Sequence, residues 1–313
     1  MSRNPLVIIR KQLGDVLLLE PALAKLAAGT GGRVTLLTRP AFSPMISLME
    51  NVQPAKGAMP GDFSSVVSFD PGFKSWFRTL LIRAPRKQLI VTRPKYLRWW
   101  QRLAYRDGCA VRSAERCYRA RYFFDTIPGD STMAFRPPRL NLPPDQWLPG
   151  GLPENYVLLH PTSAWKGKSW PVESWVNVLN DLHANGVGPF VVTGGRDSWE
   201  EKYVAALEQK TKAPVINLCG KTSLAAYLAV VSRARMVLCV DGSATHLAAA
   251  FNRPSVTLFG PTHPIHWHYP SPRSILIDAR QYSPERKPPV GLIPVDAVAN
   301  AAFSLWKETV DHG

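Results

Sequence analysis

Strand-like and helix-like segments alternate along this chain from one end to the other. A first series has short apolar, β-rich runs at Leu6–Arg10, Arg33–Thr38, Val66–Phe69 and Gln88–Thr92, with helical spacing of apolar residues between them. A second series has such runs at Tyr156–His160, Pro189–Thr193, Val215–Leu218, Met236–Val240 and Ser255–Phe259. Strands that alternate with helices are typical of parallel sheets, so the chain is predicted to be an α/β protein.

A proline-rich stretch separates the two series. Between Pro128 and Pro153, seven of 26 residues are proline, which excludes a helix and indicates a linker. A chain of 313 residues is long enough for two domains of roughly 150 residues. We therefore predict an N-terminal domain at 1–150 and a C-terminal domain at 151–313, joined by a linker at about 128–153. The last helix is a candidate to pack back on the first domain.

The charge of the chain narrows the possible partners. There are 38 Lys and Arg against 23 Asp and Glu, a formal net charge of +15, which favours a nucleotide, a nucleic acid, a phosphorylated lipid or a membrane surface. The longest apolar runs are far shorter than the roughly 20 residues of a spanning helix. The first ten residues lack the apolar core of a signal peptide. We expect a cytoplasmic protein whose four cysteines are reduced.

The loop after the first strand ends in Gly14 and Asp15, where a helix begins. A helix N-terminus stabilises a carboxylate by roughly 0.3–1 kcal/mol. Asp15 is therefore either a catalytic carboxylate or an ordinary helix cap, and the spacing leaves both interpretations open.

The loop after the strand at Tyr156–His160 combines hydroxyls, a glycine and two lysines with the start of a helix. Thr162, Ser163 and Lys168 are its candidate phosphate ligands, because free N–H groups and the helix dipole meet an ammonium there. Its end, Gly167-Lys168-Ser169, resembles a P-loop, but Thr162 stands where that motif requires its first glycine. The alternative is a solvated basic loop.

A third loop opens a helix after the strand at Met236–Val240. It contains Asp241, Gly242, Ser243 and His246, of which Gly242 permits close backbone approach and Ser243 offers a hydroxyl. A single histidine is more often structural, but His246 shares its loop with polar candidates, so a role in binding stays open.

Three histidines, His263, His266 and His268, follow the last strand-like run. Their spacing, without a nearby Cys or Glu, does not match a usual zinc site, and we expect no metal. The chain also lacks the G-x-G-x-x-G fingerprint of dinucleotide binding, so no cofactor is expected.

A basic and aromatic tract extends from Arg78 to Arg121. Tyr96, Trp99, Trp100 and Leu103 fall at helical spacing, with Arg98, Arg102 and Arg106 beside them. Such a stripe either faces a protein core or, with its basic and tryptophan side chains, contacts an anionic membrane or lipid.

Taken in order, these motifs resemble glycosyltransferase family 9, the bacterial lipopolysaccharide heptosyltransferases. The resemblance spans Gly14 to Thr262 and rests on Gly14-Asp15-Val16-Leu17, His160-Pro161-Thr162-Ser163 with Lys168-Ser169-Trp170-Pro171, Asp241-Gly242-Ser243 with His246-Leu247-Ala248-Ala249, and Phe259-Gly260-Pro261-Thr262.

The resemblance implies a GT-B fold: two Rossmann-like domains with parallel sheets that face a central cleft, the acceptor on the first and the nucleotide sugar on the second. It implies inverting, metal-independent transfer of a heptose from ADP-L-glycero-D-manno-heptose to an anionic lipopolysaccharide precursor at the inner membrane. Asp15 matches the family's proposed general base. The donor-site matches are Thr162, Ser163, Lys168, Asp241, Gly242, Ser243 and His246. We expect a monomer that is peripheral on the inner membrane and binds no nucleic acid.

The chain also departs from the family pattern. The family commonly has a hydroxyl and then a glycine after the aspartate, whereas this chain has Gly242 and then Ser243. The tract from Lys56 to Asp125 matches no pattern of the family, so the resemblance implies no particular acceptor. Three other functions stay open: a GT-B transferase for another nucleotide sugar, a P-loop-like ATPase that uses Lys168 and Asp241, and a basic nucleic-acid-binding protein.

Overall fold

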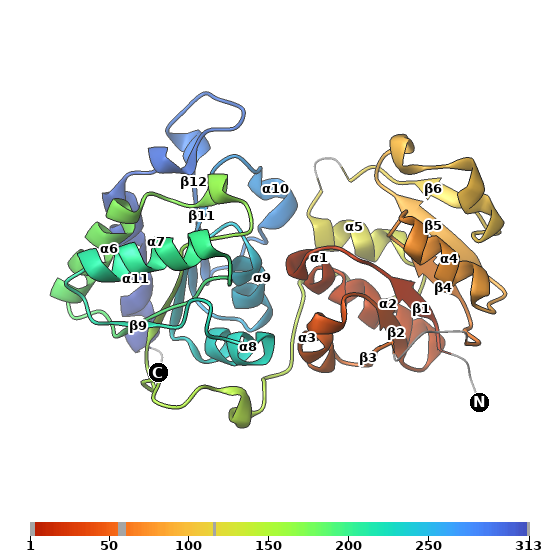
Figure 1. The fold of residues 1–313 in the computed structure, drawn as a ribbon, viewed down its shortest axis with the longest axis horizontal. Coiled ribbons are helices and arrows are strands. Elements are labelled where there is room, and N and C mark those ends of the chain that lie inside the picture. The colour runs from red at the N-terminus through yellow and green to blue at the C-terminus, as the bar shows by residue number, and fades with distance from the viewer. Residues whose placement is uncertain (1–3, 56–60, 115–116, 312–313) are drawn as a thin grey trace. The chain divides into compact units, whose positions relative to one another are not determined.

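The computed structural model describes residues 4–55, 61–114 and 117–311, which form two compact units, Met1–Asn141 and Leu142–Gly313 (Figure 1). The boundary lies inside the proline-rich stretch, before residue 150. Residues just after Leu142 belong to unit 2 because Asp145 forms an ion pair with Arg233 of that unit.

Unit 1 contains a six-stranded parallel sheet in the order β3-β2-β1-β4-β5-β6. Its strands are β1 Leu6–Ile8, β2 Val34–Leu37, β3 Val52–Pro54, β4 Val66–Ser68, β5 Lys87–Val91 and β6 Cys109–Val111. Its α-helices are α1 Leu13–Leu17, α2 Glu20–Thr30, α3 Ser43–Ser47, α4 Phe73–Leu81 and α5 Arg119–Thr126.

Unit 2 contains a second six-stranded parallel sheet in the order β12-β11-β10-β7-β8-β9. Its strands are β7 Val157–His160, β8 Phe190–Val192, β9 Val215–Asn217, β10 Met236–Val240, β11 Ser255–Phe259 and β12 Ser274–Asp278. Its helices are α6 Val172–Ala184, α7 Ser198–Lys210, α8 Leu224–Arg233, α9 Ser243–Ala250, α10 Pro264–Trp267 and α11 Val295–Asp311.

Both sheets have the same topology. Numbered within each unit, the strands lie in the order 3-2-1-4-5-6, which is the Rossmann order. The winding reverses between β1 and β4 in unit 1 and between β7 and β10 in unit 2. Ligands of such sheets bind beyond the carboxyl ends of the strands at this point. The α/β class and the two Rossmann-like sheets are thus confirmed.

Three strands, β3, β6 and β12, escaped the sequence prediction, and all three lie at a sheet edge. Two of them have a weak apolar signal, because β6 contains no buried residue and β3 contains only one. The predicted inner strands lie where expected, because they are almost wholly buried.

Helix α6 illustrates how the apolar spacing becomes packing. Trp175, Val178, Leu179 and Leu182 are fully buried along one face, as the spacing predicts, and Trp175 stacks edge-to-face on Trp170 with ring centroids 5.0 Å apart. Aromatic pairs in this geometry add roughly 0.5–1.5 kcal/mol beyond their burial.

The last helix, α11, packs against α6 and against β10, β11 and β12 of its own unit. Within the described part of the chain, no helix is both long enough and apolar enough to cross a bilayer.

Candidate active site

The reversal point of the sheet in unit 2 brings together two of the motifs that the sequence singled out. Lys168 lies in a 3-10 turn after β7, and Asp241 is the first residue after β10. Their side chains meet as an ion pair, with Lys168 Nζ 2.7 Å from Asp241 Oδ2. The Asp241 side chain is only 4% exposed and that of Lys168 18%, so the pair is largely shielded from water. The ammonium is therefore held at the strand ends where an anionic ligand of this fold would bind.

A third loop completes this cluster. Thr262, in the loop after β11, donates a hydrogen bond from its hydroxyl to the same Asp241 oxygen. The Arg280 guanidinium donates to the carbonyl oxygens of Gly260 and Thr262, each at 3.1 Å, and pairs with Asp278 at 2.9 Å. Arg280 thus fixes the loop that carries Thr262. Arg280 was not identified from the sequence, because this residue lies outside every motif. Only the folded chain brings its side chain to the loop that carries Thr262.

Ser163 and Gly242 lie next to each other. A Cβ built on Gly242 would be 3.4 Å from Ser163 Cβ, an ordinary contact, and the Gly242 φ of −174° is extended backbone that any residue adopts. Gly242 is therefore not required by its own geometry, and the swapped order of Gly242 and Ser243 costs the backbone nothing. Ser243 begins α9, and its hydroxyl lies 3.4 Å from the Tyr227 hydroxyl.

Two buried histidines lie near this cluster, one at the end of β7 and one in α9. His160, at the end of β7, is hydrogen-bonded through Nδ1 to Thr193 Oγ1 at 2.9 Å, and burial lowers its pKa to about 4. Burial likewise lowers the pKa of His246 to about 4, against the opposing charge of Asp241. Both imidazoles are neutral near pH 7, so His246 supplies no positive charge to the site.

The predicted phosphate ligands Thr162 and Ser163 differ in their surroundings. Thr162 is fully buried, and its hydroxyl has no hydrogen-bond partner among the described residues. Ser163 is partly exposed and bonds within its own loop, to Trp165. Lys166 also lies in this loop, but its ammonium faces the Trp199 ring and not Asp241.

Asp15 lies at the equivalent edge of unit 1, in α1 directly after β1. Its side chain is partly exposed, and Gln12 precedes the helix without a side-chain cap. Arg119 at the start of α5 is close enough to interact electrostatically with it: burial lowers the Arg119 pKa, and the charge of Asp15 opposes that shift. The carboxylate thus sits at the strand ends with a cation nearby.

The basic tract is not the helical stripe that its spacing predicts. Residues 94–96 and 99–103 form two separate 3-10 turns. Trp99 is 80% exposed, whereas Trp100 packs edge-on against Trp76 with ring centroids 5.1 Å apart. The basic side chains of the tract at Arg98, Arg102 and Arg106 are all exposed. The stripe is therefore neither a core face nor one continuous helix.

Two of the three clustered histidines, His263 and His268, form separate hydrogen bonds. His263 Nδ1 accepts from the Ile265 N–H at the start of α10, and His268 Nε2 is 3.0 Å from Ser274 Oγ. Over the described ranges, no group of three or more His, Cys, Asp or Glu side chains is placed to hold a metal ion.

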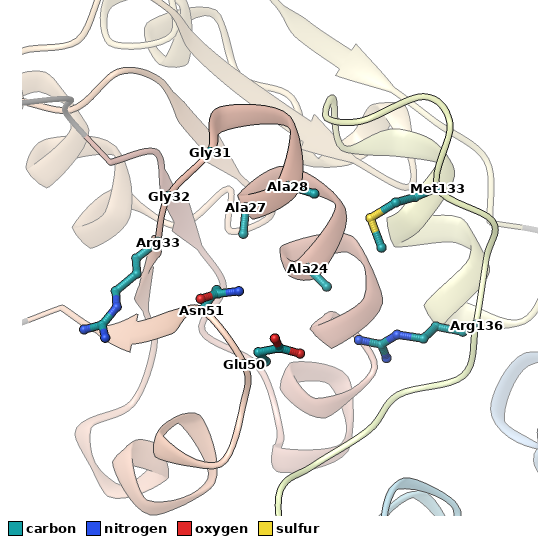
Figure 2. Close-up of a pocket in the computed structure, with 10 residues that line it drawn as sticks. All are labelled: Ala24, Ala27, Ala28, Gly31, Gly32, Arg33, Glu50, Asn51, Met133 and Arg136. Atoms are coloured by element: carbon teal, nitrogen blue, oxygen red, sulfur yellow. The ribbon is translucent and has the colours of Figure 1, made fainter.

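Unit 1 contains a hollow of about 460 Å³ (Figure 2). It is lined from α2, from Arg33 and Asn51, which precede β2 and β3, and from Met133 and Arg136. It therefore lies at the amino ends of the strands, opposite the edge that carries Asp15. Arg136 is already engaged, because it forms a two-pronged ion pair at 2.7 Å with Glu20, which is 1% exposed.

Comparison with known proteins agrees with this geometry. The sequence model of glycosyltransferase family 9 (heptosyltransferase) matches residues 133–289, half of the chain. Lipopolysaccharide heptosyltransferase 3 of Escherichia coli is 30% identical over 144 residues, 46% of this chain and 42% of the relative, so the matched stretch spans less than half of that protein.

Two solved structures share the fold over nearly the whole chain. The E. coli ADP-heptose lipopolysaccharide heptosyltransferase II superposes with a TM-score of 0.78 at 18% identity, over 97% of this chain and 99% of that one. The iron-containing dodecameric heptosyltransferase TibC of enterotoxigenic E. coli, in complex with ADP-D-β-D-heptose, superposes with a TM-score of 0.63 at 15% identity. The match covers 98% of this chain and 77% of that one. These likenesses establish the GT-B fold. With the family match, they show that the chain belongs to glycosyltransferase family 9, the heptosyltransferase family.

Proposed function

We propose that the protein transfers a heptose from ADP-L-glycero-D-manno-heptose to an inner-core acceptor of lipopolysaccharide, with inversion and without a metal. The observation that carries the proposal is the cluster of Lys168, Asp241 and Thr262 at the reversal point of unit 2, in a chain of the heptosyltransferase family. The names of its relatives, which include an ADP-heptose enzyme, support the donor.

In this proposal unit 2 binds the donor diphosphate. The Lys168 ammonium is oriented by Asp241, which accepts a hydrogen bond from Thr262, and Arg280 holds the loop that carries Thr262. An ammonium held in this way stabilises the negative charge that grows on the departing ADP, without reorganising during the reaction. The free N–H groups at the start of α9 and the hydroxyls of Ser163 and Ser243 add donors at the same edge.

Unit 1 supplies the base. An acceptor hydroxyl attacks the anomeric carbon, the new C–O bond forms as the bond from that carbon to the phosphate oxygen breaks, and ADP leaves. The hydroxyl proton passes to the Asp15 carboxylate, a step typically worth 10²–10⁴-fold in rate. The Arg119 guanidinium lies close enough to interact electrostatically with this carboxylate.

The acceptor side of the proposal rests on charge. Arg98, Arg102 and Arg106 are exposed on unit 1, and a lipopolysaccharide precursor is anionic and embedded in a membrane. Each basic residue near an anionic bilayer contributes about 1 kcal/mol of binding. We propose a monomeric enzyme that works at the cytoplasmic face of the inner membrane.

A ligand panel tests the donor. ADP, UDP and GDP, each with its sugar, are compared by thermal shift, because a ligand at 100 times its dissociation constant stabilises the protein by about 2.7 kcal/mol. We expect ADP-heptose to give the largest shift and to be consumed with a heptosylated acceptor as product. A larger shift with UDP or GDP would assign another nucleotide sugar.

A separate experiment tests whether transfer is independent of a metal, since the structurally similar TibC contains iron. Transfer is measured with and without EDTA, and the purified protein is analysed for bound metal. We expect equal rates and no stoichiometric metal. A loss of activity that a divalent ion restores would overturn metal independence.

A further inference from the structure

Helix α4 of unit 1 has its polar face buried and its apolar face exposed. Ser75 and Thr79, four residues apart, are fully buried, whereas Phe73, Phe77 and Leu81 on the other side are 63%, 48% and 52% exposed. A surface helix of a soluble protein normally shows the reverse, with its apolar stripe against the core.

This orientation is held by specific hydrogen bonds. The Ser75 hydroxyl donates to Asp70 Oδ2 at 2.7 Å, and the Thr79 hydroxyl lies 3.3 Å from the Tyr105 hydroxyl. The Lys87 ammonium donates to the Thr79 carbonyl oxygen at 2.9 Å. The helix cannot turn its apolar side inward without breaking these bonds, so the exposure of that side is a built feature of the unit.

A neighbouring segment extends the same surface. The Trp100 ring packs on Phe73 and Trp76, with centroids 6.0 and 5.1 Å away, and so joins the 3-10 turn Trp99–Leu103 to α4. Buried Gln101 fixes the turn by donating to the Pro71 carbonyl oxygen at 2.8 Å. Two side chains of this turn, Trp99 and Leu103, are 80% and 57% exposed. We call the six exposed apolar side chains the α4 patch: Phe73, Phe77, Leu80, Leu81, Trp99 and Leu103.

The surroundings of the α4 patch are strongly basic. Residues 73–111 contain ten Lys and Arg against one acidic residue, Asp107. Unit 1 as a whole has 23 Lys and Arg against nine Asp and Glu, whereas unit 2 has 15 against 14. A second copy of the chain would bring an equally positive face to this surface, so like charges oppose self-association. A nucleic acid would satisfy the charge but would leave Leu80 and Leu81 in water.

We propose that the α4 patch inserts into the interfacial layer of an anionic phospholipid bilayer, with the surrounding basic side chains on the headgroups. Apolar side chains that enter the boundary of the acyl chains, framed by Lys and Arg, are the usual composition of such a contact. This inference rests on the proposed function. It adds to that function the element of unit 1 that would contact the membrane.

The test uses the full chain and vesicles of phosphatidylglycerol, with phosphatidylcholine vesicles as the neutral comparison. The double variant Phe77→Ser with Leu81→Ser removes apolar surface that is already exposed and leaves Ser75 and Thr79 in place. We expect its affinity for the anionic vesicles to fall at least tenfold at both low and high salt, while the salt dependence stays as in the wild type. Phosphatidylcholine vesicles should bind weakly in every case.

Two controls separate apolar insertion from charge. The triple variant Arg98→Ser, Arg102→Ser and Arg106→Ser should flatten the salt dependence. The double variant Leu142→Ser with Leu292→Ser removes exposed apolar side chains of unit 2 and should bind like the wild type. Vesicles with brominated acyl chains should quench the fluorescence of the wild type more than that of Trp99→Phe.

The proposal would be overturned if the Phe77→Ser, Leu81→Ser variant bound anionic vesicles with wild-type affinity. A wild-type dimer in sedimentation that this variant dissolves would assign the patch to a second copy instead. Heptosyl transfer to a delipidated, soluble acceptor should be unchanged in the variant. If the wild type bound vesicles but transferred no heptose to that acceptor, the proposed function would fail and the membrane surface would stand.

Discussion

The two units have the same strand order but differ in where their charges lie. Unit 2 is nearly neutral in sum, and at its reversal point the buried Asp241 is bonded to the partly buried Lys168 and Thr262. Unit 1 carries almost all of the net positive charge of the chain, and most of its basic side chains near α4 are exposed. One scaffold thus holds a small, shielded polar cluster in one unit and a broad basic and apolar surface in the other. A shielded cluster suits a compact anion, and a broad surface suits an extended partner.

The largest expected effect tests the division of labour between the units. Asp15→Asn keeps the shape of the side chain but removes the proposed base, and kcat should fall by at least about 10²-fold. ADP affinity, measured by calorimetry, should be unchanged, because Lys168 and Asp241 belong to unit 2. Glu50→Gln, an exposed acid at the cavity on the opposite edge, is the matched control. Near-normal turnover of Asp15→Asn would reduce Asp15 to a helix cap.

A buried ion pair in unit 1 has a structural role, in contrast to the pair in unit 2. Glu20→Gln leaves the Arg136 guanidinium without its charge partner and should lower the free energy of unfolding by about 3 kcal/mol. Asp125→Asn breaks the exposed Arg121 pair and should cost under about 1 kcal/mol. Denaturation followed by circular dichroism measures both. Equal losses in the two variants would contradict the distinction.

The ion pair of unit 2 should matter for the ligand. Lys168→Ala removes an ammonium from the proposed phosphate site, and ADP affinity should fall roughly 10- to 100-fold, the usual contribution of a charge-assisted hydrogen bond. Lys166→Ala, two residues earlier in the same turn, is the control and should change affinity little, since its ammonium faces Trp199. Wild-type ADP affinity in Lys168→Ala would refute the donor assignment.

The smallest effect concerns pH. All seven histidines lie in unit 2, and burial lowers the pKa of His160 to about 4. The unfolded chain takes up a proton near pH 6.5 while the folded protein does not, so stability is full above pH 6.5 and declines as the pH falls toward 4. Between pH 6.5 and 5 this amounts to on the order of 1 kcal/mol for His160.

Melting temperatures of the wild type and His160→Gln across this pH range measure the effect. The variant should lose less stability toward acid than the wild type does. Parallel pH profiles would show that His160 is not the responsible group.

Prediction from sequence succeeded where the signal is local. The inner strands and α6 follow from runs and spacings of a few residues, and the candidate loops follow strands as expected. Prediction failed at 94–103, where residues at helical spacing form two 3-10 turns, since Pro94 and the packing of Trp100 override the period.

The sequence by itself determined the alternating α/β class, the two series of elements and the chemistry of each loop. Only the tertiary structure decided that Lys168 meets Asp241 and Thr262, that Arg280 fixes their loop, and that α4 turns its apolar face outward. These facts depend on pairings across long stretches of chain, 73 residues for Lys168 and Asp241 and 116 for Arg136 and Glu20. The order of the strands in the sheet determines such pairings, and the surface next to a helix determines which of its faces is buried. The spacing of apolar residues along the chain specifies neither the strand order nor the neighbouring surface.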